Sequence, residues 1–215
     1  MRTRTDDKHL QSAQPPTAAS LQSATATRDH CRQTIRTCAL FDGMTAEAIE
    51  DLTAAASTRL CDGSEAVCGS EDLDDTLCLI ASGIVAVGLT APDQDKRIVF
   101  DWAGPGEVVG EFELPGNGEK PQRVTDMFAL TTLSAVTIPG SAIRATLERQ
   151  GHPLASKLAT LTAGRRRRMA AVLTDVAFIG LVETRLARCL PDLGRRFGRP
   201  TPTRTRSPAA ADRSG

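Results

Sequence analysis

The sequence lacks histidine in the stretch that is predicted to form β-strands. Its three histidines, His9, His30 and His152, all lie outside residues 58–139. A metal-dependent enzyme on a small β-barrel needs histidines that converge inside the barrel, and a Ser/His/Asp or Cys/His set needs a histidine as its base. We therefore expect no catalytic residues, no metal site and no cofactor, and a protein that is not an enzyme.

The sequence also lacks any close pairing of cysteines. Six are present, with no CxxC pair and no tight cluster of the kind that zinc and iron–sulfur sites need: Cys31, Cys38, Cys61, Cys68, Cys78 and Cys189. We interpret them as reduced thiols, because buried and inert thiols are common among strand residues. A redox sensor that acts through one of these thiols remains an alternative.

A charge excess and long apolar runs are absent as well. The chain has 26 Lys and Arg and 26 Asp and Glu, so its formal net charge is +0. No global field attracts it to nucleic acid or to an anionic membrane, and such binding would need a local patch such as Arg165–Arg168. For this run we expect solvent contact or ion pairs between subunits rather than nucleic acid. No apolar run could span a bilayer or form a signal peptide, so we expect a cytoplasmic protein with no membrane partner.

The ends of the chain differ in composition from its middle. Residues 1–27 are rich in Thr, Ser, Gln and Ala and hold almost no large apolar residues, which predicts a disordered segment. Residues 28–150 are predicted to form one β-sandwich domain. Its first helix follows Thr45, a residue suited to cap a helix, and has apolar positions at helical spacing as far as Ala55.

Short apolar segments separated by turn residues follow between Thr58 and Pro139. Strands are predicted at residues 76–81, 84–89, 98–102 and 132–138. The first two flank Ser82 and Gly83 and are predicted to form a hairpin. With the shorter segments the set amounts to roughly eight strands, which predicts a mainly β fold with some α, a jelly roll or double-stranded β-helix.

Helical spacing returns at Ser141, and a longer helix is predicted to begin after Gly151 and Pro153. The longer helix carries an imperfect apolar stripe: Leu154, Leu158, Leu161, Met169, Val172 and Val176. A helix that leaves a small domain has little core to cover, which favours pairing with a second copy. Residues 151–190 are therefore predicted to form a dimerisation helix and the remnant of a next domain, and residues 191–215 a disordered tail. The alternative is that the stripe packs back on the sandwich.

A candidate anion site lies between Val108 and Leu130. Gly110 lets the backbone approach a ligand closely and leaves N–H groups free at the start of a short helical turn. Glu111 at its edge could accept hydrogen bonds from a sugar hydroxyl, and Arg123 on the next strand offers a planar fork of donors to phosphate oxygens. This combination suggests a cyclic nucleotide. The alternative is an ordinary surface ion pair between Glu111 and Arg123.

Four blocks of sequence carry a family resemblance. They are LFDGMTAEAIEDL from Leu40, LCLIASGIVAV from Leu77, WAGPGEVVGEFEL from Trp102 and LTDVAFIGLVETRLARCL from Leu173. In this order and spacing they resemble the effector half of the CRP/FNR regulators, the catabolite activator protein and its relatives, as far as about Phe197. The resemblance implies a cyclic-nucleotide-binding jelly roll followed by a long dimerisation helix.

The resemblance also implies roles for single residues. Gly110 and Glu111 would lie at the phosphate and ribose of cAMP or cGMP, and Arg123 at the phosphate. Val124 stands where the family usually has a hydroxyl residue, and Thr125 next to it could substitute. The predicted ligand-binding residues are Gly110, Glu111, Phe112, Arg123, Val124 and Thr125.

Other positions depart from the family pattern. Glu113 replaces a small residue, and Met169 and Ala170 fall where cAMP-binding members carry hydroxyls that read the purine. Neither of these two side chains can make such hydrogen bonds. The alternative is therefore a member that no longer binds nucleotide and acts as a sensor of redox state or another effector, or as a dimeric protein-interaction module.

DNA binding is the output that the resemblance implies. A helix-turn-helix needs two apolar-faced helices joined by a short turn, and residues 191–215 offer neither. We therefore expect the effector module of a transcription regulator, a homodimer that binds a small anionic ligand. Its DNA-binding part is expected to be truncated, frameshifted or dispensable, so that this chain alone reads no DNA sequence.

Overall fold

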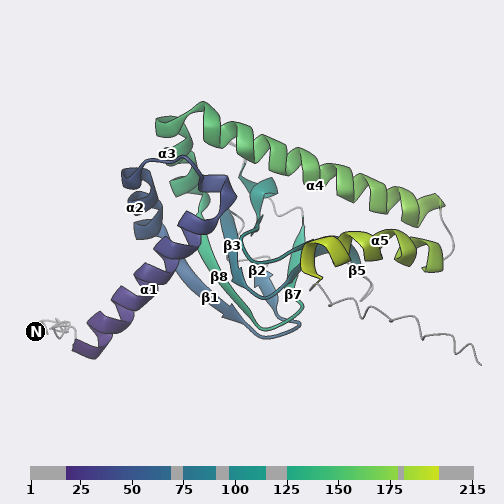
Figure 1. The fold of residues 1–215 in the computed structure, drawn as a ribbon, viewed down its shortest axis with the longest axis horizontal. Helices are drawn as coiled ribbons and strands as arrows, with labels where there is room; N and C mark the ends of the chain where they lie inside the picture. Colours follow the sequence, from purple (N-terminus) through teal and green to yellow (C-terminus); the bar gives the residue numbers. More distant parts are fainter. Residues whose placement is uncertain (1–17, 69–74, 91–96, 115–124, 179–181, 199–215) are drawn as a thin grey trace, which may run out of the picture. The chain divides into compact units, whose positions relative to one another are not determined.

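A computed structural model describes residues 18–68, 75–90, 97–114, 125–178 and 182–198 (Figure 1). The predictions of disorder for residues 1–17 and 199–215 lie outside these described residues. The chain divides into two compact units, Met1–Met169 and Ala170–Gly215, and each is described by itself.

The first unit begins with helices. They are α1 (Ala18–Thr37), the short 3₁₀ helix η1 (Ala39–Phe41) and α2 (Ala46–Ala55). The prediction for α2 is confirmed, since the Thr45 hydroxyl accepts a hydrogen bond from the Ala48 amide at 3.2 Å. Helix α1 was not predicted, and the expected disorder is wrong for residues 18–27. Its second half is held by buried apolar side chains, including Cys31 and Ile35, that face the sandwich.

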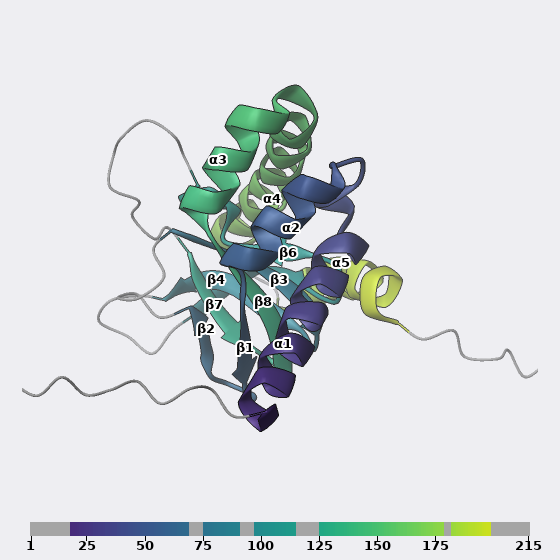
Figure 2. The same ribbon diagram turned by 90° about the vertical axis from the view of Figure 1, so that its left-hand side faces the viewer.

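Eight strands follow in the described residues, and they form two four-stranded antiparallel sheets. The strands are β1 (Ser57–Cys61), β2 (Ala66–Cys68), β3 (Thr76–Ser82), β4 (Val85–Thr90), β5 (Arg97–Ala103), β6 (Val108–Val109), β7 (Asp126–Ala129) and β8 (Leu133–Pro139). One sheet has the order β1-β8-β3-β6 and the other β2-β7-β4-β5. Helix α1 packs on β1, β3 and β8 of the first sheet (Figure 2). The predicted sandwich is therefore present.

The predicted hairpin across Ser82 and Gly83 is wrong. Strand β3 pairs with β6 and β8, whereas β4 pairs with β5 and β7, so this turn carries the chain from one sheet to the other. The turn is tight because Gly83 has φ +92° and lies against the strand that begins at Leu133. A glycine turn between two apolar strands looks the same in sequence whether it joins neighbours in a sheet or crosses between sheets.

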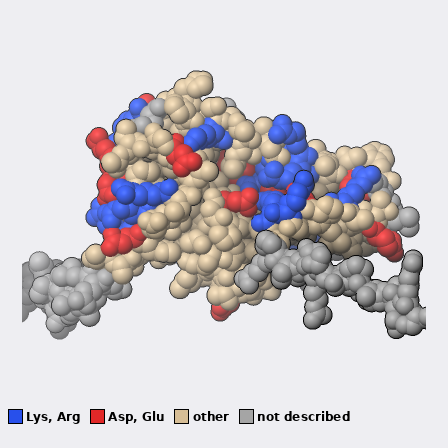
Figure 3. All heavy atoms as spheres, in the orientation of Figure 1, with Lys and Arg blue, Asp and Glu red and all other residues tan. Residues whose placement is uncertain are grey.

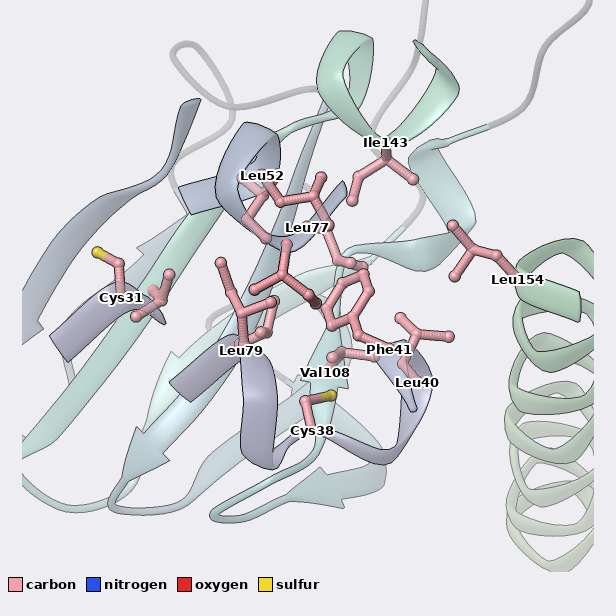
Figure 4. Close-up of a cluster of buried hydrophobic side chains, with 14 of the residues drawn as sticks. Cys31, Cys38, Leu40, Phe41, Leu52, Leu77, Leu79, Val108, Ile143 and Leu154 are labelled. Atoms are coloured by element: carbon pink, nitrogen blue, oxygen red, sulfur yellow. The ribbon is translucent and has the colours of Figure 1, made fainter. Parts of the chain in front are cut away.

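One cluster of buried apolar side chains in the first unit lies between the first sheet and the helices. Strand β3 is buried on both faces, because Leu77 and Leu79 face the helices while Cys78 and Ile80 face the other sheet. Figure 4 shows Leu40 and Phe41 of η1 beside Val108, with Leu154 reaching the cluster from another helix. Strand β6 and the residues after it are thereby fixed against η1.

Three helices follow the strands. They are α3 (Gly140–Gln150), α4 (His152–Phe178) and α5 (Val182–Phe197). In the first part of α4 the apolar stripe packs on the core, because Leu154 is buried and Leu158 and Leu161 are partly buried there. The alternative, that the apolar stripe packs back on the sandwich, is therefore confirmed for these three residues. Helix α5 continues through Pro191, so the prediction of a disordered tail from residue 191 is wrong as far as Phe197. A proline removes one backbone hydrogen bond and does not always end a helix.

Among the described residues, no helix is both long enough and apolar enough to cross a bilayer. Charges of both signs are interspersed on the face shown in Figure 3. This pattern agrees with the balanced composition of the chain.

The crossing turn at Gly83 gives a testable prediction. A Cβ at Gly83 would lie 2.5 Å from the Thr132 carbonyl oxygen, whereas a Cβ at Gly106, with a similar φ of +83°, would meet nothing within 4 Å. We expect Gly106→Ala to lower the free energy of unfolding by about 1 kcal/mol and Gly83→Ala by about 3 kcal/mol. Urea denaturation of both variants measures the difference. Equal losses would show that the turn is not closely packed.

Candidate functional site

A buried group of charged side chains joins α4 to the sandwich. Arg165 on α4 is 2% exposed and Asp101 on β5 is 1% exposed. The Nε of Arg165 donates to Oδ2 of Asp101 at 2.8 Å, and Arg168 donates to the same carboxylate through Nε at 3.0 Å and Nη2 at 2.8 Å. Residues 165 and 168 are three apart and therefore lie on one side of the helix. Asp101 thus holds two arginines of α4 at once.

Arg165 also reaches the predicted ligand site. Its Nη1 donates to Oε2 of Glu111, and its Nη2 donates to the Val108 carbonyl at 3.0 Å. All three guanidinium nitrogens therefore have acceptors on the sandwich. A buried charge is tolerated when it is paired and its hydrogen bonds are satisfied, and this arrangement meets that condition for Arg165.

The arginines set the protonation of Asp101. Burial by itself raises the pKa of this carboxyl group, but the hydrogen bonds from Arg168 and Arg165 together outweigh burial and hold the pKa at about 2, below the usual 3.8. Asp101 is therefore ionised at any pH near neutrality. Its negative charge is compensated within the protein, without a ligand.

Four of the six predicted site residues lie in the described part of the chain. Gly110 has φ +91° and opens the short 3₁₀ helix η2 (Glu111–Glu113), and a Cβ there would lie 2.2 Å from the Thr76 carbonyl oxygen. Glu111 is 5% exposed, and the Phe112 ring lies 5.9 Å from the Arg166 guanidinium. Thr125 is buried just before β7. Arg123 and Val124 lie outside the described residues, so their predicted roles remain predictions.

An open cavity of about 470 Å³ adjoins these residues. Glu111 and Phe112 line it from η2, and Thr162, Ala163 and Arg166 line it from α4. A cavity of this size can hold a nucleotide-sized molecule, since small-molecule sites span about 300 to 1,000 Å³. The turn that begins at Gly110 and one face of α4 therefore border the same space.

Two readings from the sequence are corrected by this geometry. Glu111 does not lie at the surface, because it is buried and binds Arg165, whereas the predicted pairing with Arg123 lies outside the described residues. Arg165 is neither solvated nor paired between subunits here, because both its carboxylate partners belong to its own chain. The sequence did contain the relevant signal, since four successive arginines must place at least one on the side of the apolar stripe.

Asp101 was missed entirely by the sequence analysis. It is a carboxylate inside the apolar strand β5, where a charge requires a partner. The sequence could not name that partner, because Arg165 and Arg168 come more than sixty residues later.

The predicted reduced thiols agree with the structure in their environment, since Cys31, Cys38, Cys61 and Cys78 are buried. Burial raises the pKa of the Cys31 and Cys38 thiols, which disfavours their reactive thiolate form.

Comparison with known proteins identifies this arrangement. Residues 59–150 match the family described as "Cyclic nucleotide-binding domain". A CRP-like cAMP-activated global transcriptional regulator of Mycobacterium tuberculosis is 28% identical over 159 residues, which are 74% of this chain and 68% of the relative. The chain therefore resembles CRP-like regulators, and residues 59–150 resemble a cyclic nucleotide-binding domain. The predicted jelly roll of the cyclic-nucleotide-binding type is confirmed, and the relatives with this domain are ligand-sensing regulators.

Solved structures of other regulatory proteins share the fold. The c-di-GMP responsive global regulator CLP of Xanthomonas campestris matches with a TM-score of 0.60 at 22% identity, over 74% of this chain and 77% of that one. The regulatory subunit of a cAMP-independent protein kinase A from Trypanosoma brucei matches with a TM-score of 0.53 at 19% identity, over 68% of this chain. The chain spans about half of that subunit, 51% of its length.

The buried ion pairs of Asp101 give a prediction about stability. We expect Asp101→Asn to lower the free energy of unfolding at pH 7 by about 3 kcal/mol, because it leaves two arginines short of a counter-ion. Asp75→Asn is the matched control. Asp75 makes a two-bond pair with Arg144 at 2.6 and 2.8 Å, but both side chains are partly exposed, so we expect a loss of about 1 kcal/mol or less.

The loss of folding stability in Asp101→Asn is expected to depend on pH. Because the folded-state pKa of Asp101 is lowered from 3.8 to about 2, its contribution is present above pH 3.8 and is lost as the pH falls towards 2. The difference between wild type and Asp101→Asn should therefore shrink across this range in urea denaturation curves. A difference that stays constant down to pH 2 would contradict the assignment.

Proposed function

We propose that this chain is a sensor module that binds a small anionic effector of the cyclic-nucleotide type beside Glu111 and reports its occupancy through α4. One observation carries the proposal: Glu111, at the turn opened by Gly110, binds Arg165 of α4. A ligand hydroxyl that donates a hydrogen bond to Glu111 must share this carboxylate with that arginine or displace it. Binding at the turn then acts directly on the helix.

The proposed mechanism is a shift between two positions of α4 against the sandwich. Without effector, Arg165 and Arg168 hold the helix against Asp101 and Glu111. An effector in the adjoining cavity would contact Glu111 and Phe112 on one side and Arg166 on the other. The effector changes the equilibrium between these two positions only to the extent that it binds one of them more tightly than the other. Arg123 is proposed to hold its phosphate.

The module is further proposed to act as a homodimer. In the second unit, large apolar side chains are exposed at the end of α4 and on α5: Val176 (41%), Phe178 (84%), Val182 (62%), Leu186 (54%) and Leu190 (54%). The last three are spaced by four residues and share one face of α5. A second copy is the partner that the family relationship favours for this surface. The expectation that the chain alone reads no DNA sequence remains a prediction.

A second candidate function is a sensor of an effector that is not a nucleotide. The observation in its favour is that Asp101, Glu111, Arg165 and Arg168 compensate one another's charges within the site. An entering phosphate would then depend on cations outside this group, namely Arg166 on α4 and the predicted Arg123. A redox sensor is less favoured, because the described thiols of the first unit are buried.

Calorimetric titration with cAMP and with cGMP tests the nucleotide proposal. We expect saturable binding by the wild type and a loss of about tenfold or more in affinity for Arg123→Leu, because the phosphate would lose a two-bond partner. Arg167→Leu serves as the control, since this arginine is exposed on α4. A flat wild-type titration with both nucleotides would reject the nucleotide and support the second candidate.

Sedimentation velocity at micromolar concentration tests the dimer. We expect a wild-type species of twice the chain mass, and a dissociation constant at least about tenfold higher for Leu186→Glu, which places a charge on an apolar interface. Leu60→Glu is the matched control, because Leu60 is 78% exposed but lies on β1. If both variants behave alike, α5 is not in the interface.

A further inference from the structure

A second cavity lies along a different face of α4 from the one beside Glu111. Its volume is about 410 Å³. Residues of η1 and the turn before β6 form one wall, including Leu40 and Val108. The other wall is a single stripe of α4 that runs from Ser156 to Arg168. All of these residues belong to the first unit of the chain.

The cavity is long. Ser156 and Arg168 both line it and are twelve residues apart, which corresponds to roughly 18 Å along a helix. A volume of about 410 Å³ over this length leaves a narrow channel rather than a round pocket. A channel of this form fits a chain-like molecule better than a bulky ring system.

The middle of the channel is apolar. Cys38, Leu40 and Val108 line it from the sandwich side, and Leu161 lines it from α4. The first three are almost fully buried, and burial raises the pKa of the Cys38 thiol, which stays neutral. An apolar segment of a ligand would be favoured here, because it would leave water for a hydrophobic surface.

A cation stands near one end of the channel. Lys157 donates from Nζ to the carbonyl oxygens of Ala39 at 2.9 Å and Asp42 at 2.7 Å. An ammonium group has three donors, so one proton remains for a ligand. Within the described residues Lys157 makes no ion pair with a carboxylate, unlike Arg165 and Arg168 further along the channel.

Several acidic groups lie near the channel. Asp101 binds Arg165 and Arg168, Glu111 binds Arg165, and Glu107 accepts a hydrogen bond from the Gly104 amide at 2.8 Å. Asp42 lies near the Lys157 end, where its carbonyl accepts from Lys157 and its charge acts on Cys38, but its carboxylate makes no ion pair with Lys157 among the described residues. Of the cations that line the channel, Lys157 is therefore the one whose charge a ligand can pair with. An anionic head group would accept the remaining hydrogen bond of this lysine, and the apolar body of the ligand would lie along the channel.

We infer that this channel is a binding site for an elongated apolar anion, such as a medium-chain carboxylate, with its head group on Lys157. The inference goes beyond the proposed function and stands on geometry of its own, so it holds whether or not the Glu111 site takes a nucleotide. Arg165 lines the channel and also binds Glu111. A ligand here would therefore lie next to Arg165, which holds α4 against the sandwich.

Calorimetry with sodium decanoate, on the full-length chain, tests the inference. We expect saturable binding of one decanoate per chain. Thr160→Trp should weaken it by about tenfold or more, because Thr160 is an exposed residue of α4 that lines the channel, where an indole would fill the space. Thr162→Trp is the matched control, since Thr162 lines the cavity beside Glu111 instead. It should leave decanoate binding unchanged.

The role of Lys157 has a separate readout. Decanol has the same tail without the charge, so we expect wild type to prefer decanoate over decanol by about tenfold, and Lys157→Met to abolish this preference. Arg167→Met, a charge removed from an exposed position of the same helix, should keep the preference. Comparing the two ligands within each variant separates loss of the charge from any general change in folding.

Several results would overturn the inference. They are no saturable decanoate binding by the wild type, equal weakening by both tryptophan variants, or a preference for decanoate that survives Lys157→Met. Binding that appears only when the dimer is diluted would also overturn it, because the channel would then be covered by a second copy. A nucleotide titration of Thr160→Trp keeps the two sites apart, since this variant should bind cAMP or cGMP as the wild type does.

Discussion

Arg165 places a guanidinium in the interior of the first unit, where an ion without partners would cost several kcal/mol. Asp101, Glu111 and the Val108 carbonyl together satisfy its nitrogens. This interaction decides how the first part of α4 lies on the sandwich, because the three acceptors come from β5, β6 and the turn after β6. The apolar contacts of Leu154 add to it, but they are not directional.

The group formed by Asp101, Glu111, Arg165 and Arg168 is consequently neutral by itself. Its carboxylates already have arginine partners, and one of them, Asp101, stays ionised because those partners outweigh burial. An effector that enters beside this group would gain little from simple attraction to it. It must exchange hydrogen bonds with groups that are already paired, and such an exchange connects the turn at Gly110 to the helix.

Helix α4 borders two cavities in the first unit, one on each of two faces. One face borders the cavity beside Glu111 and Phe112, and the other borders the apolar channel with Lys157 near its end. The arginine run supplies groups to both, since Arg166 lines the first cavity while Arg165 and Arg168 line the second. Four consecutive arginines can do this because successive helix positions turn by about 100°.

The sequence by itself determined the elements that depend on local pattern. The cap at Thr45, the strands around Leu79 and Val87, the long helix and the glycine turn at Gly110 all follow from spacing and residue type, and four ordered blocks pointed to the family. Only the tertiary structure decided which sheet each strand joined, that α1 covers β3, and that Asp101 meets Arg165. These are contacts between residues far apart in the chain, and the local signals at each end are compatible with several partners. Burial of a charge then selects the one arrangement in which every donor finds an acceptor.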